Sequence, residues 1–82
     1  MDVRKTVGDN FARIRREKGL TQEKIEELSG FSQQYLSGLE RGKRNPTIVS
    51  LYELSVTLSV DLEEFFKPVA DTNLADSRVP DP

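Results

Sequence analysis

Two adjacent glutamines, small polar residues at helical spacing and a closing run of cations distinguish one segment of the sequence. Residues 29–44 read SGFSQQYLSGLERGKR. A glutamine amide carries two donor hydrogens and two acceptor lone pairs, so it can form paired hydrogen bonds with a flat polar edge. Lysine and arginine side chains bind anionic oxygens. These residue types in this order favour contact with a surface that is both polar and anionic.

The composition excludes several other kinds of chemistry. The 82-residue chain has no cysteine and no histidine, and therefore no disulfide, thiolate nucleophile, zinc-finger ligand set or histidine acid/base catalyst. The carboxylates show neither metal-ligand spacing nor a convergent cluster of titratable groups. We therefore predict that the protein is not an enzyme and has no metal, cofactor or small-molecule ligand.

Length and hydropathy indicate one small cytoplasmic domain. A domain of this size has a modest core, so oligomerisation is expected. No apolar run approaches the ~18 residues of a transmembrane span, and the start MDVRKTVGDNFARIRR lacks the apolar stretch of a signal peptide. We predict a cytoplasmic protein without membrane contact.

The charges are distributed unevenly along the chain, although the net charge is only −2. Of the 12 lysines and arginines, only Lys67 and Arg78 follow Asn45. The same part of the chain carries the carboxylates Glu53, Asp61, Glu63, Glu64, Asp71, Asp76 and Asp81. Because salt screens charges beyond a Debye length of about 8–10 Å, a local basic face can bind phosphate whatever the total charge.

Apolar spacing, caps and glycines predict five short helices and no strand. The first helix runs from about Thr6 to Lys18 and stops at Gly19. The later four begin at the N-caps Thr21, Ser32, Thr47 and Asp61, the last of which opens a capping box with Glu64. In the fourth helix the predicted inner face comprises Ile48, Leu51, Leu54, Ser55 and Leu58. We predict an all-α fold, a compact five-helix bundle.

A short turn that contains Gly30 joins the second and third helices, which is the sequence form of a helix-turn-helix. This motif spans about residues 22–41, within a single predicted domain of residues 1–67. From residue 69 onward the chain is polar, contains two prolines and lacks apolar periodicity. We predict that residues 68–82 form a flexible, disordered tail.

The 3.6-residue period indicates which side chains of the third helix point outward. With Leu36 and Leu39 placed in the core, the outward residues are Gln33, Gln34, Ser37, Gly38 and Arg41. Gln33 and Gln34 lie in the first turn, which enters deepest when such a helix occupies the major groove of DNA. There a glutamine can pair with N6 and N7 of adenine or bond to guanine. The predicted base-reading residues are Gln33, Gln34, Ser37 and Gly38.

The middle and the end of the third helix add two further features. A glycine inside a helix costs roughly 1 kcal/mol relative to alanine, so Gly38 suggests close approach of a base edge or a sugar-phosphate chain. Arg41, Lys43 and Arg44, with Asn45 beside them, are placed to contact phosphate oxygens. A face of glutamine, serine and arginine is most often only solvated. We favour groove recognition because the polar face, the tight turn, the mid-helix glycine and the basic loop coincide.

Residues 22–44 resemble the helix-turn-helix of the Cro and phage-repressor type, known as the XRE family. The residues that carry the resemblance are Thr21-Gln22-Glu23, Gly30, Phe31, Leu36-Ser37, Leu39-Glu40-Arg41-Gly42, Lys43-Arg44-Asn45-Pro46-Thr47 and the run Leu51, Leu54, Leu58 and Val60. The resemblance covers roughly residues 6–67. It implies a five-helix, all-α fold and regulation of transcription through DNA.

The resemblance also implies roles for individual residues. Gln22 matches a glutamine that binds a phosphate at the N-terminus of the second helix, where anions are favoured. Gln33 and Gln34 match the base-reading pair. Arg15 and Glu40 match an ion pair between the first and third helices; the alternatives are a phosphate contact for Arg15 and a solvated carboxylate for Glu40.

Three positions depart from the family pattern or have two open roles. Glu26 stands where the family has alanine or glycine, at the crossing of the second and third helices. Either its carboxylate points outward along a snorkelling stem, or the crossing is slightly open. Leu28 stands where a polar residue is common, so we expect it to be partly exposed. Tyr35 either donates its hydroxyl to a phosphate or packs over the second helix.

One copy of such a small domain reads only a few base pairs. We therefore predict a homodimer that reads an inverted repeat, with half-sites about one helical turn, ~34 Å, apart. The acidic second part of the chain is the expected interface, because its charge would not oppose DNA there. The candidate interface residues are Val60, Leu62, Phe65 and Phe66; alternatively, both phenylalanines cover the bottom of the core.

The predicted function is sequence-specific binding of double-stranded DNA by a transcriptional regulator. The alternative from another class is an antitoxin or a protein-interaction module that uses the same fold. A partner protein would need apolar anchors in an ordered tail, and the tail offers only Val69, Leu74 and Val79.

Overall fold

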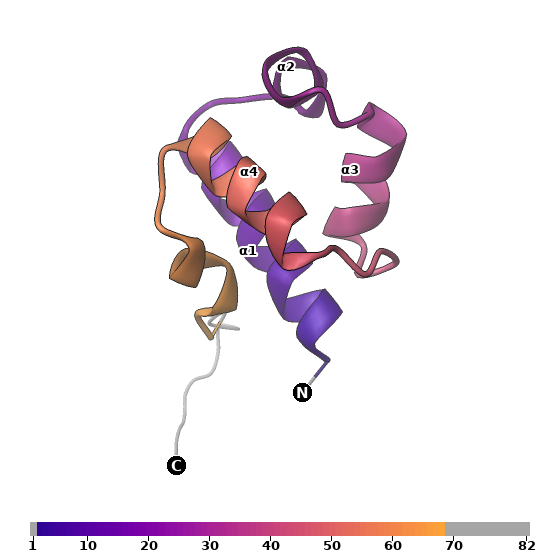
Figure 1. The fold of residues 1–82 in the computed structure, drawn as a ribbon, viewed down its shortest axis with the longest axis vertical. Coiled ribbons are helices and arrows are strands. Elements are labelled where there is room, and N and C mark those ends of the chain that lie inside the picture. Colours follow the sequence, from indigo (N-terminus) through magenta and orange to yellow (C-terminus); the bar gives the residue numbers. More distant parts are fainter. Residues whose placement is uncertain (1, 69–82) are drawn as a thin grey trace.

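The computed structural model describes residues 2–68, which form four α-helices followed by a 3-10 helix (Figure 1). Their bounds are α1 Val3–Glu17, α2 Gln22–Ser29, α3 Gln33–Glu40, α4 Ile48–Leu58 and η1 Leu62–Phe66. Within residues 2–68 there is no strand. The all-helical prediction is confirmed, but the fifth helix is a short 3-10 helix. The predicted tail, apart from Pro68, lies outside the described residues.

Three of the predicted N-caps form as expected. The side-chain oxygens of Thr21, Ser32 and Thr47 each accept a hydrogen bond from the backbone N–H three residues later, at distances of 2.9–3.0 Å. The capping box predicted at Asp61 is wrong, because no side-chain cap bond forms there. The N–H of Glu64 donates instead to the backbone carbonyl of Asp61 at 3.0 Å. That i to i+3 bond starts a 3-10 helix and uses the donor that the capping box needs.

Helix α1 begins three residues before the predicted start. The Asp2 side chain caps it by accepting a hydrogen bond from the N–H of Arg4 at 3.1 Å. Val3 lies four residues before Val7, at helical spacing, so the apolar pattern does extend to the observed start and the predicted start was too late.

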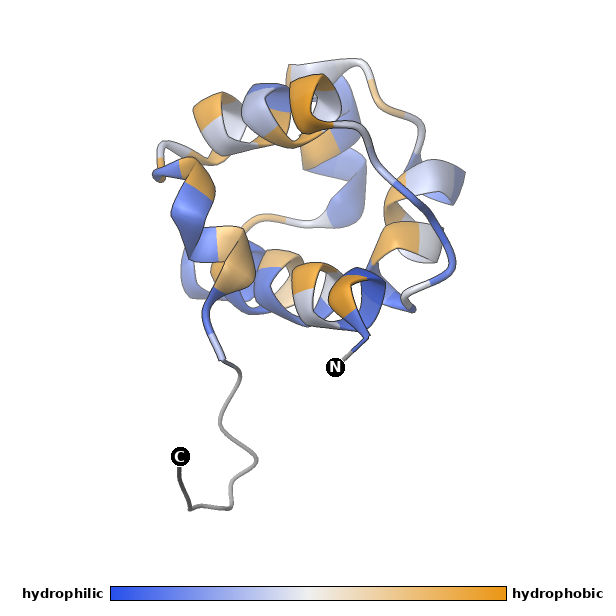
Figure 2. Ribbon diagram, turned by 60° about the horizontal axis from the view of Figure 1, so that its bottom comes forward, coloured by the Kyte–Doolittle hydropathy of each residue, from blue (hydrophilic) through white to orange (hydrophobic). Residues whose placement is uncertain are grey.

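The core brings together apolar side chains from every helix. Its buried members are Val7, Phe11, Ile14, Ile25, Leu36, Leu39, Leu51, Leu54, Leu58 and Phe65, all at most 4% exposed. Apolar and hydrophilic stretches alternate along the helices (Figure 2). In the packing, α1 lies against α3 and η1, while α2 lies against α3 and α4. The third helix is therefore held from both sides by other helices.

A glycine sets the distance between α1 and α3. A Cβ atom on Gly8 would overlap the carbonyl oxygen of Leu39 and would lie 3.2 Å from the backbone of Glu40. Only a residue without a side chain fits there, because the obstructing atoms belong to backbone. Gly8 thus allows α1 to approach the end of α3 closely.

A buried asparagine joins α1 to η1. Asn10 is fully buried, and its Nδ2 donates to the backbone carbonyls of Phe65 at 2.9 Å and Lys67 at 2.7 Å. Nearby, Lys67 forms a 2.8 Å ion pair with Glu64. The hydrogen bond from Lys67 holds the pKa of the Glu64 carboxyl below its ordinary value. These contacts attach the end of the described chain to its first helix.

The described residues contain no helix that is both long enough and apolar enough to cross a membrane.

Candidate nucleic-acid interface

The turn between α2 and α3 has a fixed conformation. Gly30 ends α2 with φ +85°, in the left-handed region that favours glycine. The Ser29 hydroxyl donates to the carbonyl of Ile25 at 2.7 Å and accepts from the N–H of Phe31 at 3.1 Å. The Phe31 ring then stacks on that of Tyr35, with centroids 5.4 Å apart. The start of α3 is therefore held by local hydrogen bonds and by aromatic packing.

The outward face of α3 carries amides, a hydroxyl and a guanidinium. Gln33 and Gln34 are exposed in its first turn, and within residues 2–68 neither side chain has a hydrogen-bond partner. Ser37 lies one turn later and is partly buried. Its hydroxyl accepts a hydrogen bond from Arg41, a further turn along, at 2.6 Å. The two amides can thus meet an incoming polar surface without first breaking internal bonds.

Gly38 differs from the other outward residues, because it is buried. A Cβ atom there would lie 3.0 Å from Nε of Arg44 and 3.2 Å from its Cγ. Close approach was predicted for Gly38 from an outside surface. In the structure, the group that approaches it is the Arg44 side chain of the same chain.

The same arginine also covers Tyr35. Its guanidinium carbon lies 5.5 Å from the centroid of the Tyr35 ring, within the range of a cation–π contact. Partial burial raises the pKa of the Tyr35 hydroxyl above its ordinary value, although the neighbouring positive charge of Arg44 acts in the opposite direction. Arg44 is thus positioned along α3 by an aromatic face and by the gap at Gly38.

Arg15 and Glu40 form a two-pronged ion pair between α1 and α3. The distances are 2.6 Å from Nε to Oε2 and 3.2 Å from Nη2 to Oε1, and the side chains are only 15% and 10% exposed. Arg15 also donates to the carbonyl of Leu20 at 2.9 Å. The pair therefore neutralises a carboxylate at the end of α3 and joins that end to α1.

The remaining predicted phosphate ligands lie at the edges of the motif. Gln22 is the first residue of α2 and is partly buried, whereas Lys43 and Asn45 are exposed in the loop between α3 and α4. Among the described residues, no side-chain hydrogen bond joins these three to the other predicted site residues. These three residues are near the motif because they lie next to α2 and α3 in the chain.

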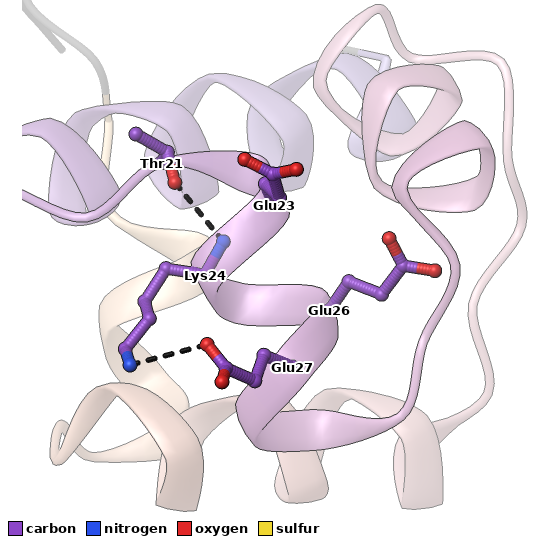
Figure 3. Close-up of a pocket in the computed structure, with 5 residues that line it drawn as sticks. All are labelled: Thr21, Glu23, Lys24, Glu26 and Glu27. Carbon is purple, nitrogen blue, oxygen red and sulfur yellow. Dashed lines mark hydrogen bonds and ion pairs between the residues drawn. The ribbon is translucent and has the colours of Figure 1, made fainter.

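The outer side of α2 is acidic. An open hollow there is lined by Thr21, Glu23, Lys24, Glu26 and Glu27 (Figure 3). Lys24 pairs with Glu27 at 3.2 Å, whereas the Glu26 side chain extends away from both. Glu26 is exposed, so its side chain is accessible to solvent. Leu28 is 54% exposed, in line with its polar counterpart in the family.

The residues predicted for a dimer contact differ in their exposure. Phe65 is fully buried against Phe11, with ring centroids 6.5 Å apart, so it has no surface to offer a second copy. Phe66 is 39% exposed, while Val60 and Leu62 pack partly against the core. Of this set, Phe66 presents the most accessible apolar side chain.

Sequence reasoning missed an apolar surface on α4. Ile48, assigned above to the inner face, is 65% exposed, which corrects that prediction. It lies on the flank that also carries Val49, Tyr52 and Val56, exposed by 65%, 59% and 59%. Laying the helical period over residues 48–58 would have separated these four from Leu51, Leu54 and Leu58. Of the four, only Ile48 was predicted to be buried, because of its apolar character.

Comparison with known proteins finds a helix-turn-helix family and relatives that are transcriptional regulators or control proteins. The HTH_3 family, described as Helix-turn-helix, matches residues 11–65. The HTH-type transcriptional regulator y4dJ of Sinorhizobium fredii, itself uncharacterized, is 64% identical over 72 residues, which are 88% of this chain and 94% of that protein. The control protein C.MunI of a Mycoplasma species is 32% identical over 69 residues, 83% of this chain and 93% of that one.

Solved structures of similar fold include two restriction-modification controller proteins. C.AhdI of Aeromonas hydrophila matches with a TM-score of 0.73 and 35% identity, over 77% of this chain and 96% of that one. C.Esp1396I, solved as a tetramer in complex with its natural 35 base-pair operator, matches with a TM-score of 0.69 and 34% identity, over 79% and 96%. The fold, the turn and these matches agree: the chain belongs to the HTH_3 helix-turn-helix family, also called XRE, and is homologous to HTH-type transcriptional regulators and controller proteins.

Proposed function

We propose that this protein binds double-stranded DNA in a sequence-specific way, as a homodimer on an inverted repeat, and thereby regulates transcription. The observation that carries the proposal is the pair Gln33 and Gln34, exposed in the first turn of α3 without internal hydrogen-bond partners among residues 2–68. Amides in that position can form bidentate hydrogen bonds with base edges in the major groove. Ser37 would follow along the same groove.

Phosphate contacts would come from the groups that surround α3. Arg41, Lys43, Arg44 and Asn45 are exposed at its end and in the following loop. Gln22 begins α2, where the N–H groups and the helix dipole attract an anion. Such contacts fix the orientation of a protein on the duplex and make its affinity dependent on salt.

Tyr35 and Arg44 would act together in this scheme. The ring face of Tyr35 and the gap at Gly38 hold the guanidinium near α3 before any DNA arrives. An arginine whose rotamers are already restricted loses less entropy on binding than a free one. A tyrosine hydroxyl is protonated at neutral pH, so that of Tyr35 can donate a hydrogen bond to a phosphate oxygen.

The relatives support the proposal that this protein binds DNA. C.Esp1396I has been solved as a tetramer on its operator, and the curated relatives include HTH-type transcriptional regulators and control proteins. For this chain, a two-fold dimer would double the few base contacts that one α3 can make. Its half-sites would then be about one helical turn, ~34 Å, apart.

Selection from a random pool of DNA duplexes tests the proposal directly. The purified protein is incubated with the pool at moderate salt, and the retained duplexes are sequenced. We expect enrichment of an inverted repeat with half-site centres about one turn apart. A folded, helical protein that enriches no sequence would refute base reading and would favour the antitoxin or protein-interaction alternative.

A further inference from the structure

Three cations at the end of α3 have no carboxylate partner in the described part of the chain. Arg41, Lys43 and Arg44 are exposed, and none of them forms an ion pair within residues 2–68. The guanidinium groups of the two arginines contact a hydroxyl and an aromatic ring instead. We call residues 41–44 the cationic loop. A local cluster of positive charge attracts any acidic group that can reach it.

The part of the chain that follows the described residues is acidic. Residues 69–82, which we call the acidic segment, carry Asp71, Asp76 and Asp81 against a single cation, Arg78. One positive and three negative side chains give the segment a formal charge of −2. The acidic segment and the cationic loop therefore have charges of opposite sign.

The acidic segment begins near the cationic loop. The carbonyl of Lys67 accepts a hydrogen bond from Asn10 on α1 at 2.7 Å. On the other side of α1, a Cβ atom on Gly42 would lie 3.2 Å from Cα of Lys5. Lys5 and Asn10 are five residues, or about 8 Å, apart along the helix axis. The end of the described chain and the cationic loop thus flank the same stretch of α1 (Figure 1), roughly 20 Å from each other.

The length of the acidic segment decides which of its carboxylates can reach the loop. An extended chain spans at most about 3.6 Å per residue. Counted from residue 67, Asp71 reaches about 14 Å, whereas Asp76 and Asp81 reach about 32 Å and 50 Å. Only the two later aspartates can therefore lie over the cationic loop. A tethered group acts at an effective concentration of the order of millimolar, so ion pairs too weak to hold a free peptide can form.

We propose that the acidic segment docks on the cationic loop of its own chain, through Asp76 and Asp81, and competes there with DNA phosphates. This regulation rests on the proposed function, because the cations of the loop are among its phosphate ligands. Lysine and arginine bind carboxylate and phosphate oxygens by the same charge-assisted hydrogen bonds. DNA must then displace the segment before its backbone can occupy the loop, which weakens the part of the affinity that depends on charge.

A spin label on the acidic segment tests its position. The chain has no cysteine, so Ser77→Cys provides a single attachment site for a nitroxide, next to Asp76. The nitroxide broadens the NMR signals of nearby backbone amides. In the full chain without DNA, we expect broadening in the cationic loop and none in α2, and its loss when Asp76→Asn and Asp81→Asn are added. No broadening in the loop, or broadening that survives these two substitutions, would overturn the proposal.

Dilution separates docking within one chain from docking between two chains. The spin-labelled and isotope-labelled protein is mixed with an excess of wild type that carries neither label. Broadening of the cationic loop that stays unchanged supports docking within the chain. Broadening that fades on dilution would assign the acidic segment to a second copy and refute the proposal.

Two double variants with the same change in net charge test the competition with DNA. Asp76→Asn with Asp81→Asn should bind a random duplex about fivefold more tightly at low salt, the combined effect of two exposed ion pairs. The difference from the wild type should shrink as salt screens the charges. Glu63→Gln with Asp71→Asn removes carboxylates that lie too near the start of the segment to reach the loop, and should change the affinity less than about twofold. Equal gains in the two variants would indicate general repulsion of DNA and contradict docking.

The outcomes for docking and for DNA reading are distinguishable, because the spin-label experiment contains no DNA. If the nitroxide broadens the cationic loop but the protein enriches no duplex sequence, the proposed function fails and docking stands. If the protein selects an inverted repeat and the loop signals are unaffected by the nitroxide, docking fails and DNA reading stands.

Discussion

Side chains at the start of α3 and in the loop after it have two different environments. Gln33 and Gln34 are exposed and have no internal hydrogen bonds within residues 2–68, whereas Arg44 is held by Tyr35 and Gly38. The first kind of group is suited to choosing among base edges. The second is suited to holding a charge in one place. Removing each kind of side chain should change the binding affinity for specific and for random DNA in a different way.

We expect Gln33→Ala and Gln34→Ala each to weaken binding to the selected site by roughly 1–3 kcal/mol and to relax base preference. Arg44→Ala is the matched comparison. It should weaken binding to all sequences and make the slope of affinity against salt shallower by about one. Fluorescence anisotropy with selected and scrambled duplexes at several salt concentrations measures both. Equal losses on the two duplexes for the glutamine variants would contradict base reading.

The Arg15–Glu40 pair gives a second prediction at this scale. Both side chains are largely buried and joined by two hydrogen bonds, so removing one leaves a buried charge without its partner. Arg15→Ala should lower the free energy of unfolding by about 3 kcal/mol. Lys24→Ala breaks the exposed pair with Glu27, at side-chain exposures of 50% and 70%, and should cost at most about 1 kcal/mol. Urea unfolding compares the two, and similar losses would show that the buried pair contributes nothing special.

At the scale of elements, the approach of α1 to α3 depends on a glycine. Alanine normally stabilises a helix interior by about 1 kcal/mol relative to glycine. Gly8→Ala should instead destabilise the protein by about 1–3 kcal/mol, because its Cβ would meet the backbone of Leu39 and Glu40. Thermal and urea unfolding measure the sign of the change.

Gly38→Ala is the control for that substitution. Its Cβ would meet only the flexible Arg44 side chain, which can move. We expect a much smaller change in stability than for Gly8→Ala, together with altered DNA affinity as Arg44 leaves Tyr35. A stabilised Gly8→Ala protein would show that the two helices can separate without cost.

Elements determined by local signals could be predicted from the sequence. The caps at Thr21, Ser32 and Thr47 and the left-handed turn at Gly30 depend on residues a few positions apart, and all four are present in the structure. The outward position of Gln33 and Gln34 also follows from helical period alone.

Features that depend on distant parts of the chain could not be predicted in the same way. The return of Arg44 over Gly38, the contact of Gly8 with Leu39 and the bonds of Asn10 to residues 65 and 67 require the packed fold. The flank of α4 was missed because exposed and buried apolar residues look alike by type. Whether Phe65 or Phe66 faced inward depended on the 3-10 geometry of η1, which the capping-box interpretation did not anticipate.

At the scale of the whole molecule, stability and assembly are linked. A small domain with one modest core gains stability by association, since anything that binds only the folded state favours that state. We expect the melting temperature of the wild type to rise with protein concentration. A differential scanning fluorimetry series over two decades of concentration measures this. A wild-type melting temperature that does not change with protein concentration would contradict dimerisation.

The bond between Asn10 and the carbonyls of Phe65 and Lys67 also orders events during synthesis. Helix α1 leaves the ribosome first, but its buried amide finds these partners only after residue 67 has emerged. Isolated helices of this length are marginal in water, and Phe11 lacks the ring of Phe65 until the same moment. The contact that joins α1 to η1 therefore forms only after residue 67 has emerged.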